Sequence, residues 1–280
     1  MKTLLEAILS KNGFQLSRYR PLSGGDINAV YLLETTPKLV VKINDKHRYP
    51  GMFSAEAKGL KLLKSSDSFL IPEVIDTGEI GDFSYLLMTY IESGKADGNF
   101  SERFAVALAT LHRCTHEKFG LGYANYIGSL PQYNAFCDTA DALYITQRLE
   151  PQFKLASEKG FPVKPSASFY ENISDEIPHE KPSLIHGDLW SGNYLISRDG
   201  NPVLIDPAVS YASREMDLAM MQLFGGFDNA IYKNYHAIFP LEEGWQKRVD
   251  IWQLYYLLVH LNLFGSSYLS AVKTIINRYA

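Results

Sequence analysis

Short apolar runs separated by turn residues dominate the first ninety residues of the chain. Apolar positions at helical spacing predict two helices in this part, over residues 4–11 and 52–64. The alternating or β-branched runs between and after them are typical of strands in a small antiparallel sheet. These strands are predicted over residues 14–22, 29–34, 38–43, 70–80 and 83–91.

Helical spacing replaces this pattern further along the chain. Small polar residues over 93–98 mark a boundary between two lobes. A helix capped by Ser101 is predicted to follow, because Phe104, Leu108 and Leu111 recur at spacings of three and four and share one face.

The rest of the chain is predicted to be mainly helical. Residues 120–165 have the weakest periodicity, whereas 228–239 and 245–279 are helix-patterned and expected to form the core of the second lobe. We therefore predict an α+β fold with a small antiparallel-sheet lobe over residues 1–92 and a larger, mainly helical lobe over residues 93–280.

A hairpin in the second lobe places polar residues together. Residues 194–197 and 203–205 are apolar runs joined by a turn that contains Asp-Gly and proline. In an antiparallel pair the residue before the first strand lies beside the residue that ends the second, so Asn193 should lie near Asp206. Asp188 is on the loop that leads to the same end. The acid and amide suit Mg2+, which prefers oxygen ligands, and a second acid could orient a hydroxyl nucleophile.

These residues resemble a known family. His186-x-Asp188 with Asn193 and Asp206 resembles the catalytic and metal-binding loops of protein-kinase-like phosphotransferases, with Gly187 in place of the usual arginine. The octapeptide His-Gly-Asp-Leu-Trp-Ser-Gly-Asn is the most specific match. With the later segments Ile-Asp-Pro-Ala and Arg-Glu-Met-Asp-Leu-Ala-Met, it resembles the fructosamine kinase, or ketosamine-3-kinase, family, which is related to aminoglycoside phosphotransferases. The resemblance implies a protein-kinase-like fold and a requirement for ATP and Mg2+.

Two features of the first lobe are then expected to bind the nucleotide phosphates. The turn that carries Gly24 and Gly25 could lay backbone N–H groups over a phosphate chain, although a hairpin turn without a ligand is the simpler interpretation of this stretch. Lys42 ends an apolar strand, and Glu56 is the first acid of the following helix. Kinases pair such residues and place the lysine on the α- and β-phosphates. The alternative is two unrelated surface charges.

The resemblance also assigns a place for adenine. The end of the last predicted strand of the first lobe looks like the hinge on which adenine would rest through backbone groups. Its residues are Met88, Thr89, Tyr90 and Ile91.

In the second lobe, Asp188 is expected to accept or orient the proton of the acceptor hydroxyl, while Asn193 and Asp206 would hold Mg2+. Trp190 could offer a flat face to a sugar, or could be a core residue that braces the loop. Asp217 is expected to accept hydrogen bonds from the catalytic-loop backbone and to contact the acceptor; the alternative is a helix-dipole acid. Other acceptor-side residues are expected from 120–165, unless that stretch is a purely structural insert.

The activity that the resemblance implies is ATP-dependent phosphorylation of the 3-hydroxyl of a ketosamine, the adduct of a sugar with a small amine or a protein lysine, which leads to deglycation. Three alternatives use the same residues: an aminoglycoside- or choline-type kinase, a non-catalytic pseudokinase, and a hydrolase with an aspartate pair. The aminoglycoside reading is disfavoured by the mixed charge of residues 120–182, and the pseudokinase reading by the presence of every expected catalytic residue type.

Composition limits the partners. A formal net charge of −4 over 280 residues provides no basic footprint for nucleic acid or for an anionic membrane. Cys114 and Cys137 are too few for a disulfide framework and are typical of a reducing compartment. The apolar run near the carboxyl end is too short to span a bilayer. A cytoplasmic location is therefore predicted.

Overall fold

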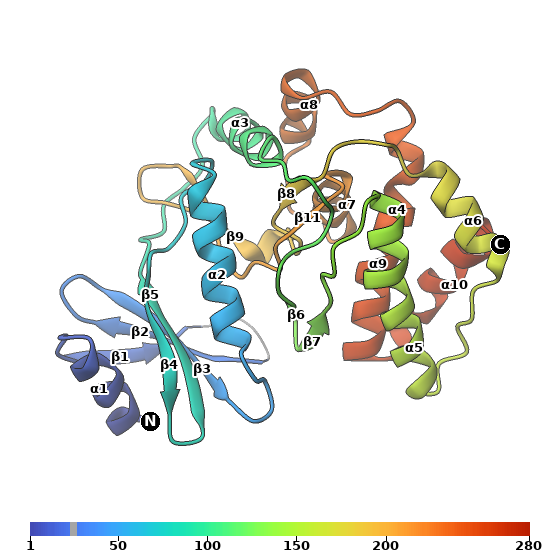
Figure 1. The fold of residues 1–280 in the computed structure, drawn as a ribbon. Coiled ribbons are helices and arrows are strands. Elements are labelled where there is room, and N and C mark those ends of the chain that lie inside the picture. Colours follow the sequence, from blue (N-terminus) through green and yellow to red (C-terminus); the bar gives the residue numbers. More distant parts are fainter. Residues whose placement is uncertain (23–26) are drawn as a thin grey trace.

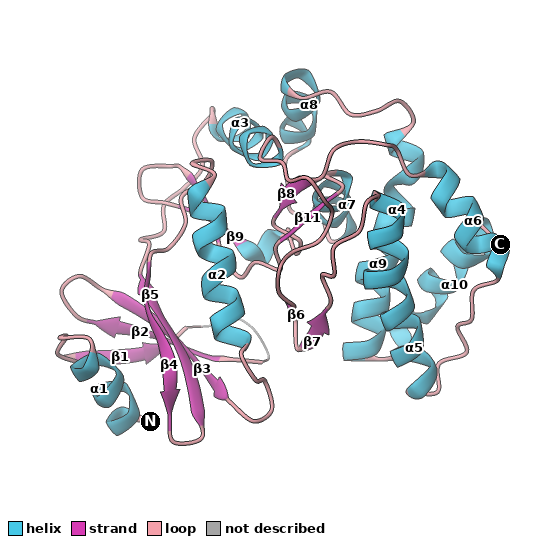
Figure 2. Cartoon of the chain, in the orientation of Figure 1, coloured by secondary structure: helices cyan, strands magenta, loops and turns pink. Residues whose placement is uncertain are grey.

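A computed structural model describes residues 1–22 and 27–280, and it has the predicted α+β architecture. Figures 1 and 2 show a sheet lobe that contains the amino terminus and a mainly helical lobe that contains the carboxyl terminus. Gly24 and Gly25, the expected phosphate-loop glycines, lie outside the described residues. Among the helices of the described chain, none is long and apolar enough to cross a membrane.

The sheet lobe contains a five-stranded antiparallel sheet in the order β1-β2-β3-β5-β4. The predicted strand at 70–80 begins at Val74, because Pro72 has no N–H group to donate to a ladder. Two helices accompany the sheet, α1 (Lys2–Lys11) and α2 (Met52–Ser65). The strands are β1 (Arg18–Pro21), β2 (Ala29–Glu34), β3 (Leu39–Asp45), β4 (Val74–Ile80) and β5 (Phe83–Thr89).

Alternation along β3 sends successive side chains to opposite faces of the sheet. Leu39, Val41 and Ile43 join a buried core with α1, whereas Val40 packs against the core that α2 shares. Lys42 lies on the same face as Val40, on a strand paired with both β2 and β5. The period of two therefore directs the lysine toward α2 and away from α1.

The helix α2 meets this lysine with an acid. Phe53, Leu60 and Leu63 on α2 are buried against the sheet and the second lobe. Glu56 is three residues after Phe53 and four before Leu60, so it shares their inward face. The same spacing that buries the apolar side chains thus carries the glutamate into the interior.

The helical lobe begins with α3. This helix starts at Phe100 with Asn99 at its N-cap and no side-chain capping hydrogen bond, so the prediction that Ser101 caps it is wrong. The helices are α3 (Phe100–His112), α4 (Ala140–Leu143), α5 (Glu150–Glu158), α6 (Ala167–Glu176), α7 (Glu215–Leu223), α8 (Asn229–Ile238), α9 (Trp245–Phe264) and α10 (Leu269–Arg278). Antiparallel pairs join β6 (Asn125–Ile127) to β7 (Leu130–Gln132), β8 (Ser183–Ile185) to β11 (Ser210–Ala212), and β9 (Tyr194–Ile196) to β10 (Pro202–Leu204).

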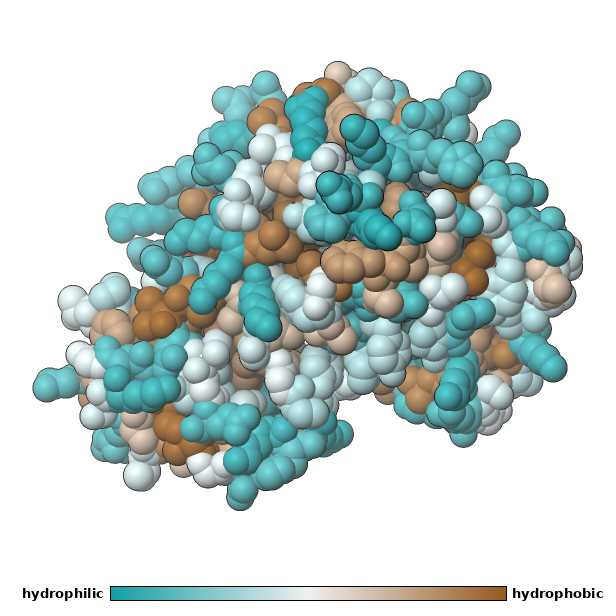
Figure 3. All heavy atoms as spheres, viewed as in Figure 1, coloured by the Kyte–Doolittle hydropathy of each residue, from teal (hydrophilic) through white to brown (hydrophobic). Residues whose placement is uncertain are grey.

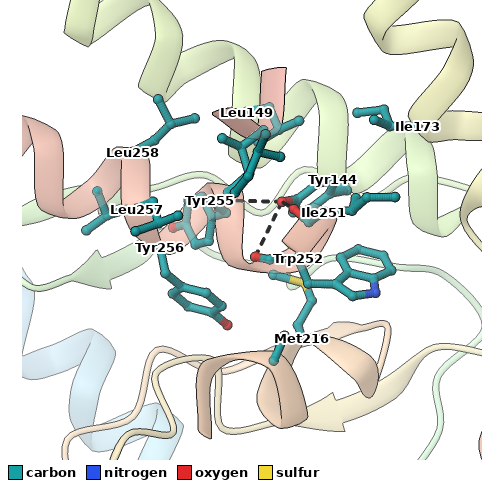
Figure 4. Close-up of a cluster of buried hydrophobic side chains, with 14 of the residues drawn as sticks. Tyr144, Leu149, Ile173, Met216, Ile251, Trp252, Tyr255, Tyr256, Leu257 and Leu258 are labelled. Carbon is teal, nitrogen blue, oxygen red and sulfur yellow. Dashed lines mark hydrogen bonds between the residues drawn. The ribbon is translucent and has the colours of Figure 1, made fainter. Parts of the chain in front are cut away.

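The weakly periodic stretch contains regular structure. A π-helical turn, Tyr144–Leu149, joins α4 directly to α5. Its wider winding shifts the phase of the apolar positions, which explains why the helical period is obscured in the sequence. Tyr144 from this turn packs edge-on against Trp252 of α9, with ring centroids 4.8 Å apart, inside the core of the helical lobe (Figure 4).

Aromatic rings pack where α3 meets elements of both lobes. Phe104 of α3 is fully buried, and its ring lies 5.2 Å from Phe69, 5.5 Å from Tyr194 and 5.7 Å from Phe227 between ring centroids. The backbone of Leu70 beside it exchanges two hydrogen bonds with β10. These contacts connect the chain before β4 to the hairpin of the helical lobe.

We expect Phe104→Ala to lower the free energy of unfolding by about 3–5 kcal/mol, because it removes a buried ring from a closely packed cluster. Val106→Ala on the same helix is the matched control, since Val106 is 47% exposed, and it should change stability by less than about 0.5 kcal/mol. Urea denaturation measures both. Equal losses in the two variants would contradict the inferred packing role.

Candidate active site

The predicted hairpin is present and closes beside the loop that follows β8. In the register of β9 with β10, Tyr194 faces Leu204, and the N–H of Ile205 donates to the carbonyl of Asn193 at 3.0 Å. Asn193 and Asp206 are therefore at the same end of the hairpin. The amide nitrogen of Asn193 donates to the carboxylate of Asp188 at 3.1 Å and to its backbone carbonyl at 2.9 Å. Its amide oxygen is left for another partner.

Lys42 reaches the same place from the sheet lobe. Its Nζ lies 2.7 Å from Oε1 of Glu56 and also contacts Oδ1 of Asp206. Burial by itself would lower the pKa of Lys42, but the negative charges of Asp206 and Glu56 outweigh burial and raise it. The lysine is therefore a positive charge held between two carboxylates, in place of the unrelated surface charges considered as the alternative.

Asp188 is half-buried next to this charge cluster. Burial raises its pKa to about 7, and the negative charge of Asp206 contributes in the same direction, while the hydrogen bond from Asn193 acts against both. A carboxylate with a pKa near neutrality can accept a proton from a bound hydroxyl more readily than an ordinary aspartate.

The backbone at Asp206 has an unusual conformation. Its φ is +56°, a region that non-glycine residues seldom occupy. Residues held in such conformations cluster at functional sites, where surrounding contacts over-determine them. Here the contact with Lys42 and the end of β10 hold the carboxylate at the site.

Glycine is required at position 187 by lack of space. Gly187 has a φ of +83°, and a Cβ atom on it would lie 2.1 Å from the carbonyl oxygen of Ala208. Any side chain, including the arginine of protein kinases, would collide with this backbone. The close approach also lets the N–H of Ala208 donate to the carbonyl of His186 at 2.9 Å.

Asp217 anchors the loop from beneath. It is fully buried on α7, and its carboxylate accepts hydrogen bonds from the N–H of His186 at 2.7 Å and of Gly187 at 2.8 Å. The ring of His112 adds a third contact at 3.2 Å. The expected contact with the loop backbone is therefore present. The expected contact with an acceptor is wrong, because Asp217 has no exposed surface.

His186 connects the loop to the hairpin. Its Nε2–H donates to the carbonyl of Ile205 at 2.9 Å, and its Nδ1 accepts the N–H of Asp188 at 3.3 Å. Burial lowers the pKa of His186, which favours the neutral ring that this pair of bonds requires. Both ring nitrogens of His186 are therefore used to hold the loop against the hairpin, and neither is available to carry a proton.

A cleft of about 800 Å³ brings most of the predicted residues together. Trp190 is 40% exposed at its wall, so it is not a core residue. Its ring lies on Gly192, where a Cβ atom would be 2.2 Å away. In the space-filling view of Figure 3, the outline is indented between the sheet lobe and the helical lobe. The predicted residues that line the cleft are Lys42, Glu56, Asp188, Trp190, Asn193 and Asp206.

The expected hinge segment does not line this cleft. Met88 is buried in β5, and the N–H groups of Thr89 and Tyr90 donate to the carbonyls of Glu73 and Lys38. Neither N–H can therefore also donate to adenine. Of the four hinge residues, Ile91 remains the one whose N–H has no partner within the described chain.

The other wall of the cleft comes mostly from α7 and α9. Sequence reasoning assigned residues 245–279, which include α9, to the core and expected acceptor-side residues from 120–165, of which only the β6–β7 hairpin takes part. In α9, residues 254–264 are apolar apart from two tyrosines, His260 and Asn262, so no pattern in the sequence separated the positions that line the cleft from those that form the core. The lining residues in these helices, or directly after α7 in the case of Phe224, are Met220, Phe224, Tyr256, Val259, His260, Leu263 and Phe264.

Comparison with solved structures defines the class of the fold. The structure aligns with wild-type aminoglycoside 2'-phosphotransferase-IIIa in its GDP complex at a TM-score of 0.56 and 13% identity, over 99% of this chain and 98% of that one. At this identity the likeness shows the fold alone. The fold is that of the kinase-like phosphotransferases.

Closer comparisons identify the family. The fructosamine kinase model matches residues 2–280. A probable ketoamine kinase of Enterococcus faecium is 42% identical, over 92% of this chain and 94% of its own length. The crystal structure of a candidate fructosamine-3-kinase from Haemophilus somnus aligns at a TM-score of 0.88 and 29% identity, over 98% of this chain and 96% of that one. The chain belongs to the fructosamine kinase family.

We expect Asp217→Asn to lower the free energy of unfolding by about 2–4 kcal/mol, because the new amide would present N–H groups to a backbone N–H donor in a buried place. Asp228→Asn is the control: Asp228 caps the exposed start of α8 through Ala230, and its loss should cost less than about 1 kcal/mol. Thermal unfolding compares the two. A similar small loss in both variants would show that the buried carboxylate does not anchor the loop.

Asp188→Asn should have the opposite effect on stability. Because the folded pKa of about 7 is above the unfolded value of about 3.9, folding takes up a proton between these pH values, and stability present at low pH is lost as the pH rises through this window. The variant avoids this loss. We expect it to exceed the parent by about 1–2 kcal/mol at pH 8 and to match it near pH 4 in urea denaturation.

Asp199→Asn, on the exposed turn of the hairpin, is the control for this experiment and should change stability at neither pH. An Asp188→Asn variant that is less stable than the parent at pH 8 would show that the carboxylate is not destabilised by its surroundings.

Proposed function

We propose that this protein is an ATP-dependent kinase that phosphorylates the 3-hydroxyl of ketosamines, carried either by small amines or by protein lysines. The observation that carries the proposal is one cleft in which Lys42, Asp188, Asn193 and Asp206 meet, in a chain of the fructosamine kinase family. The names of similar proteins, ketoamine kinase and fructosamine-3-kinase, support the choice of acceptor.

Mg2+ fits the donor chemistry at the end of the hairpin. Asp206 offers a carboxylate, and Asn193 offers an amide oxygen because its nitrogen is bonded to Asp188. Mg2+ is commonly held by one or two protein oxygens with phosphate oxygens completing its shell. When bound, ATP would supply the transferable γ-phosphoryl group, and Mg2+ would neutralise part of the charge on the phosphates.

The remaining nucleotide contacts come from the sheet lobe. Lys42, which is paired with Glu56, is proposed to hold the α- and β-phosphates. The turn with Gly24 and Gly25 is proposed to cover the phosphates, and the backbone of Ile91 to contact adenine. We place the division between the lobes at residues 92 and 93; the N–H of Gly94 donates to the carbonyl of Ile196 at 2.8 Å, so the chain already packs on the hairpin there.

Asp188 is the proposed base. As the acceptor oxygen forms its bond to the γ-phosphorus, the bond from that phosphorus to the ADP oxygen breaks, and the hydroxyl proton passes to the Asp188 carboxylate. The raised pKa favours this proton transfer near neutral pH. A phosphate at the third carbon makes the ketosamine unstable and returns the free amine, so the proposed outcome is deglycation.

The charge of the cleft bears on the aminoglycoside alternative. Its carboxylates within the described chain are Glu56, Asp188 and Asp206, and the wall formed by α7 and α9 is aromatic and aliphatic. A polycationic acceptor would call for acids on that wall. A sugar with C–H faces fits aromatic side chains such as Trp190 better.

The test is ATP consumption with Mg2+ on a panel of four acceptors: a ribulose-lysine adduct, a fructose-lysine adduct, an aminoglycoside and choline. We expect turnover only on the adducts, with phosphate at the third carbon by NMR, and release of free lysine. Asp188→Asn should lower the rate about 10²–10⁴-fold.

The pH profile supplies an independent check. Because the base must be deprotonated, kcat/KM should fall about tenfold per pH unit below about pH 7 and level off above it. Turnover confined to the aminoglycoside or choline would keep the kinase but overturn the acceptor, and an active Asp188→Asn variant would overturn the assigned base.

A further inference from the structure

One hydroxyl in the wall of the cleft has no protein partner. Tyr256 of α9 is fully buried, and its Oη makes no hydrogen bond within the described residues. Buried hydroxyl groups are nearly always hydrogen-bonded, because leaving one unpaired forfeits its interaction with water. Four buried side-chain atoms of the described chain lack partners, on Arg103, Tyr123, Tyr256 and Asn262, and among these residues only Tyr256 lines the cleft.

Two nearby tyrosines have hydrogen-bonded hydroxyls, which distinguishes Tyr256 from them. The hydroxyl of Tyr255 donates to Oε1 of Gln132 at 2.7 Å, and that of Tyr144 donates to the carbonyl of Ile251. Consecutive residues of a helix point about 100° apart, so Tyr255 and Tyr256 face different surroundings. In Figure 4, the ring of Tyr256 is directed away from Tyr144 and Tyr255 within the core of the helical lobe.

Tyr256 and Asp188 line the same cavity. Burial raises the pKa of Tyr256 well above its usual value, and the negative charges of Asp217 and Asp188 contribute to the increase. The group therefore stays a neutral hydroxyl that can both donate and accept a hydrogen bond.

The surroundings favour a sugar as the partner. Phe224 and Phe264 lie in the same wall, 41% and 56% exposed, and His260 is one helical turn after Tyr256. The Nδ1–H of His260 donates to the carbonyl of Tyr256 at 2.8 Å. A wall of apolar rings with isolated hydrogen-bonding groups matches the alternating C–H faces and hydroxyls of a sugar chain.

The geometry points to Tyr256 as a substrate-binding residue whose hydroxyl forms a hydrogen bond with a hydroxyl of the acceptor sugar other than the one phosphorylated. This inference rests on the proposed kinase function and adds the acceptor-binding wall to it. The bond positions the sugar so that its reacting hydroxyl lies at Asp188. It also satisfies the buried oxygen that the protein leaves without a partner.

The test compares Tyr256→Phe with Tyr255→Phe, two variants that remove one oxygen each from adjacent rings. In Tyr256→Phe, we expect the KM for the ketosamine to rise about tenfold, because a tenfold weaker affinity corresponds to the loss of a single hydrogen bond. The KM for ATP should be unchanged. Its melting temperature should be unchanged or higher, because no protein bond is lost. Tyr255→Phe should show the reverse: a lower melting temperature from the lost bond to Gln132, with unchanged KM values.

Deoxy analogues of the ketosamine distinguish a hydrogen bond to the sugar from a purely structural role of Tyr256. The wild type and Tyr256→Phe should differ on the parent adduct and become equal on the one analogue that lacks the bound hydroxyl. An unchanged ketosamine KM in Tyr256→Phe, or a persistent difference on every deoxy analogue, would overturn the inference. The hydroxyl of Tyr256 would then be hydrogen-bonded to a water molecule and not to the sugar.

Failure of the proposed function is a separate outcome. If the wild type phosphorylates no ketosamine, the acceptor assignment fails before the variants are compared. In that case the variants are measured on whichever acceptor is phosphorylated. A higher KM for that acceptor in Tyr256→Phe, with kcat unchanged, would keep Tyr256 as an acceptor-binding residue. An unchanged KM would reject it.

Discussion

The buried carboxylate of Asp217 is the interaction on which the rest of the site depends. A charge without exposed surface must be satisfied by hydrogen bonds, and this one is satisfied by two backbone N–H groups of the catalytic loop and by His112. Tyr235 then binds the other ring nitrogen of His112 at 2.8 Å, and Arg214 donates to Tyr235. The loop that carries Asp188 is thereby tied through α7 to α3 and α8, which are rigid parts of the helical lobe.

Close packing at two glycines also fixes the position of the loop that Asp217 anchors. At Gly187 the loop passes so close to Ala208 that no side chain fits, and at Gly192 the chain passes directly beneath the ring of Trp190. Both contacts are consequences of the anchored loop lying against the hairpin. The octapeptide therefore has glycine at these two positions because the chain there lies too close to its neighbours for a side chain. A ring as large as tryptophan can stay half-exposed at the cleft because Gly192 provides a flat support for it.

The charges of the cleft lower the stability of the ionised form of Asp188. Burial disfavours ionisation of Asp188, and the negative charge of Asp206 raises the pKa of Asp188 further. Lys42 offsets part of this repulsion through Asp206, and Glu56 holds the lysine in place. A carboxylate whose pKa lies near neutrality is the result. An exposed aspartate, such as Asp199 at the tip of the same hairpin, has no comparable surroundings.

The sequence by itself determined the features that depend on local periodicity and on short spacing. Alternation along β3 faced Lys42 toward α2, the helical period placed Glu56 inward, and the turn residues set the hairpin that joins Asn193 to Asp206. Gly24 and Gly25 lie outside the described residues, so their role stays a prediction. Tertiary structure alone decided the burial of Asp217, the use of the hinge N–H groups by Glu73 and Lys38, and the cleft wall from α7 and α9. These features depend on contacts between residues far apart in the chain, and a mostly apolar stretch such as residues 254–264 of α9 carries no pattern that distinguishes a cleft wall from a core.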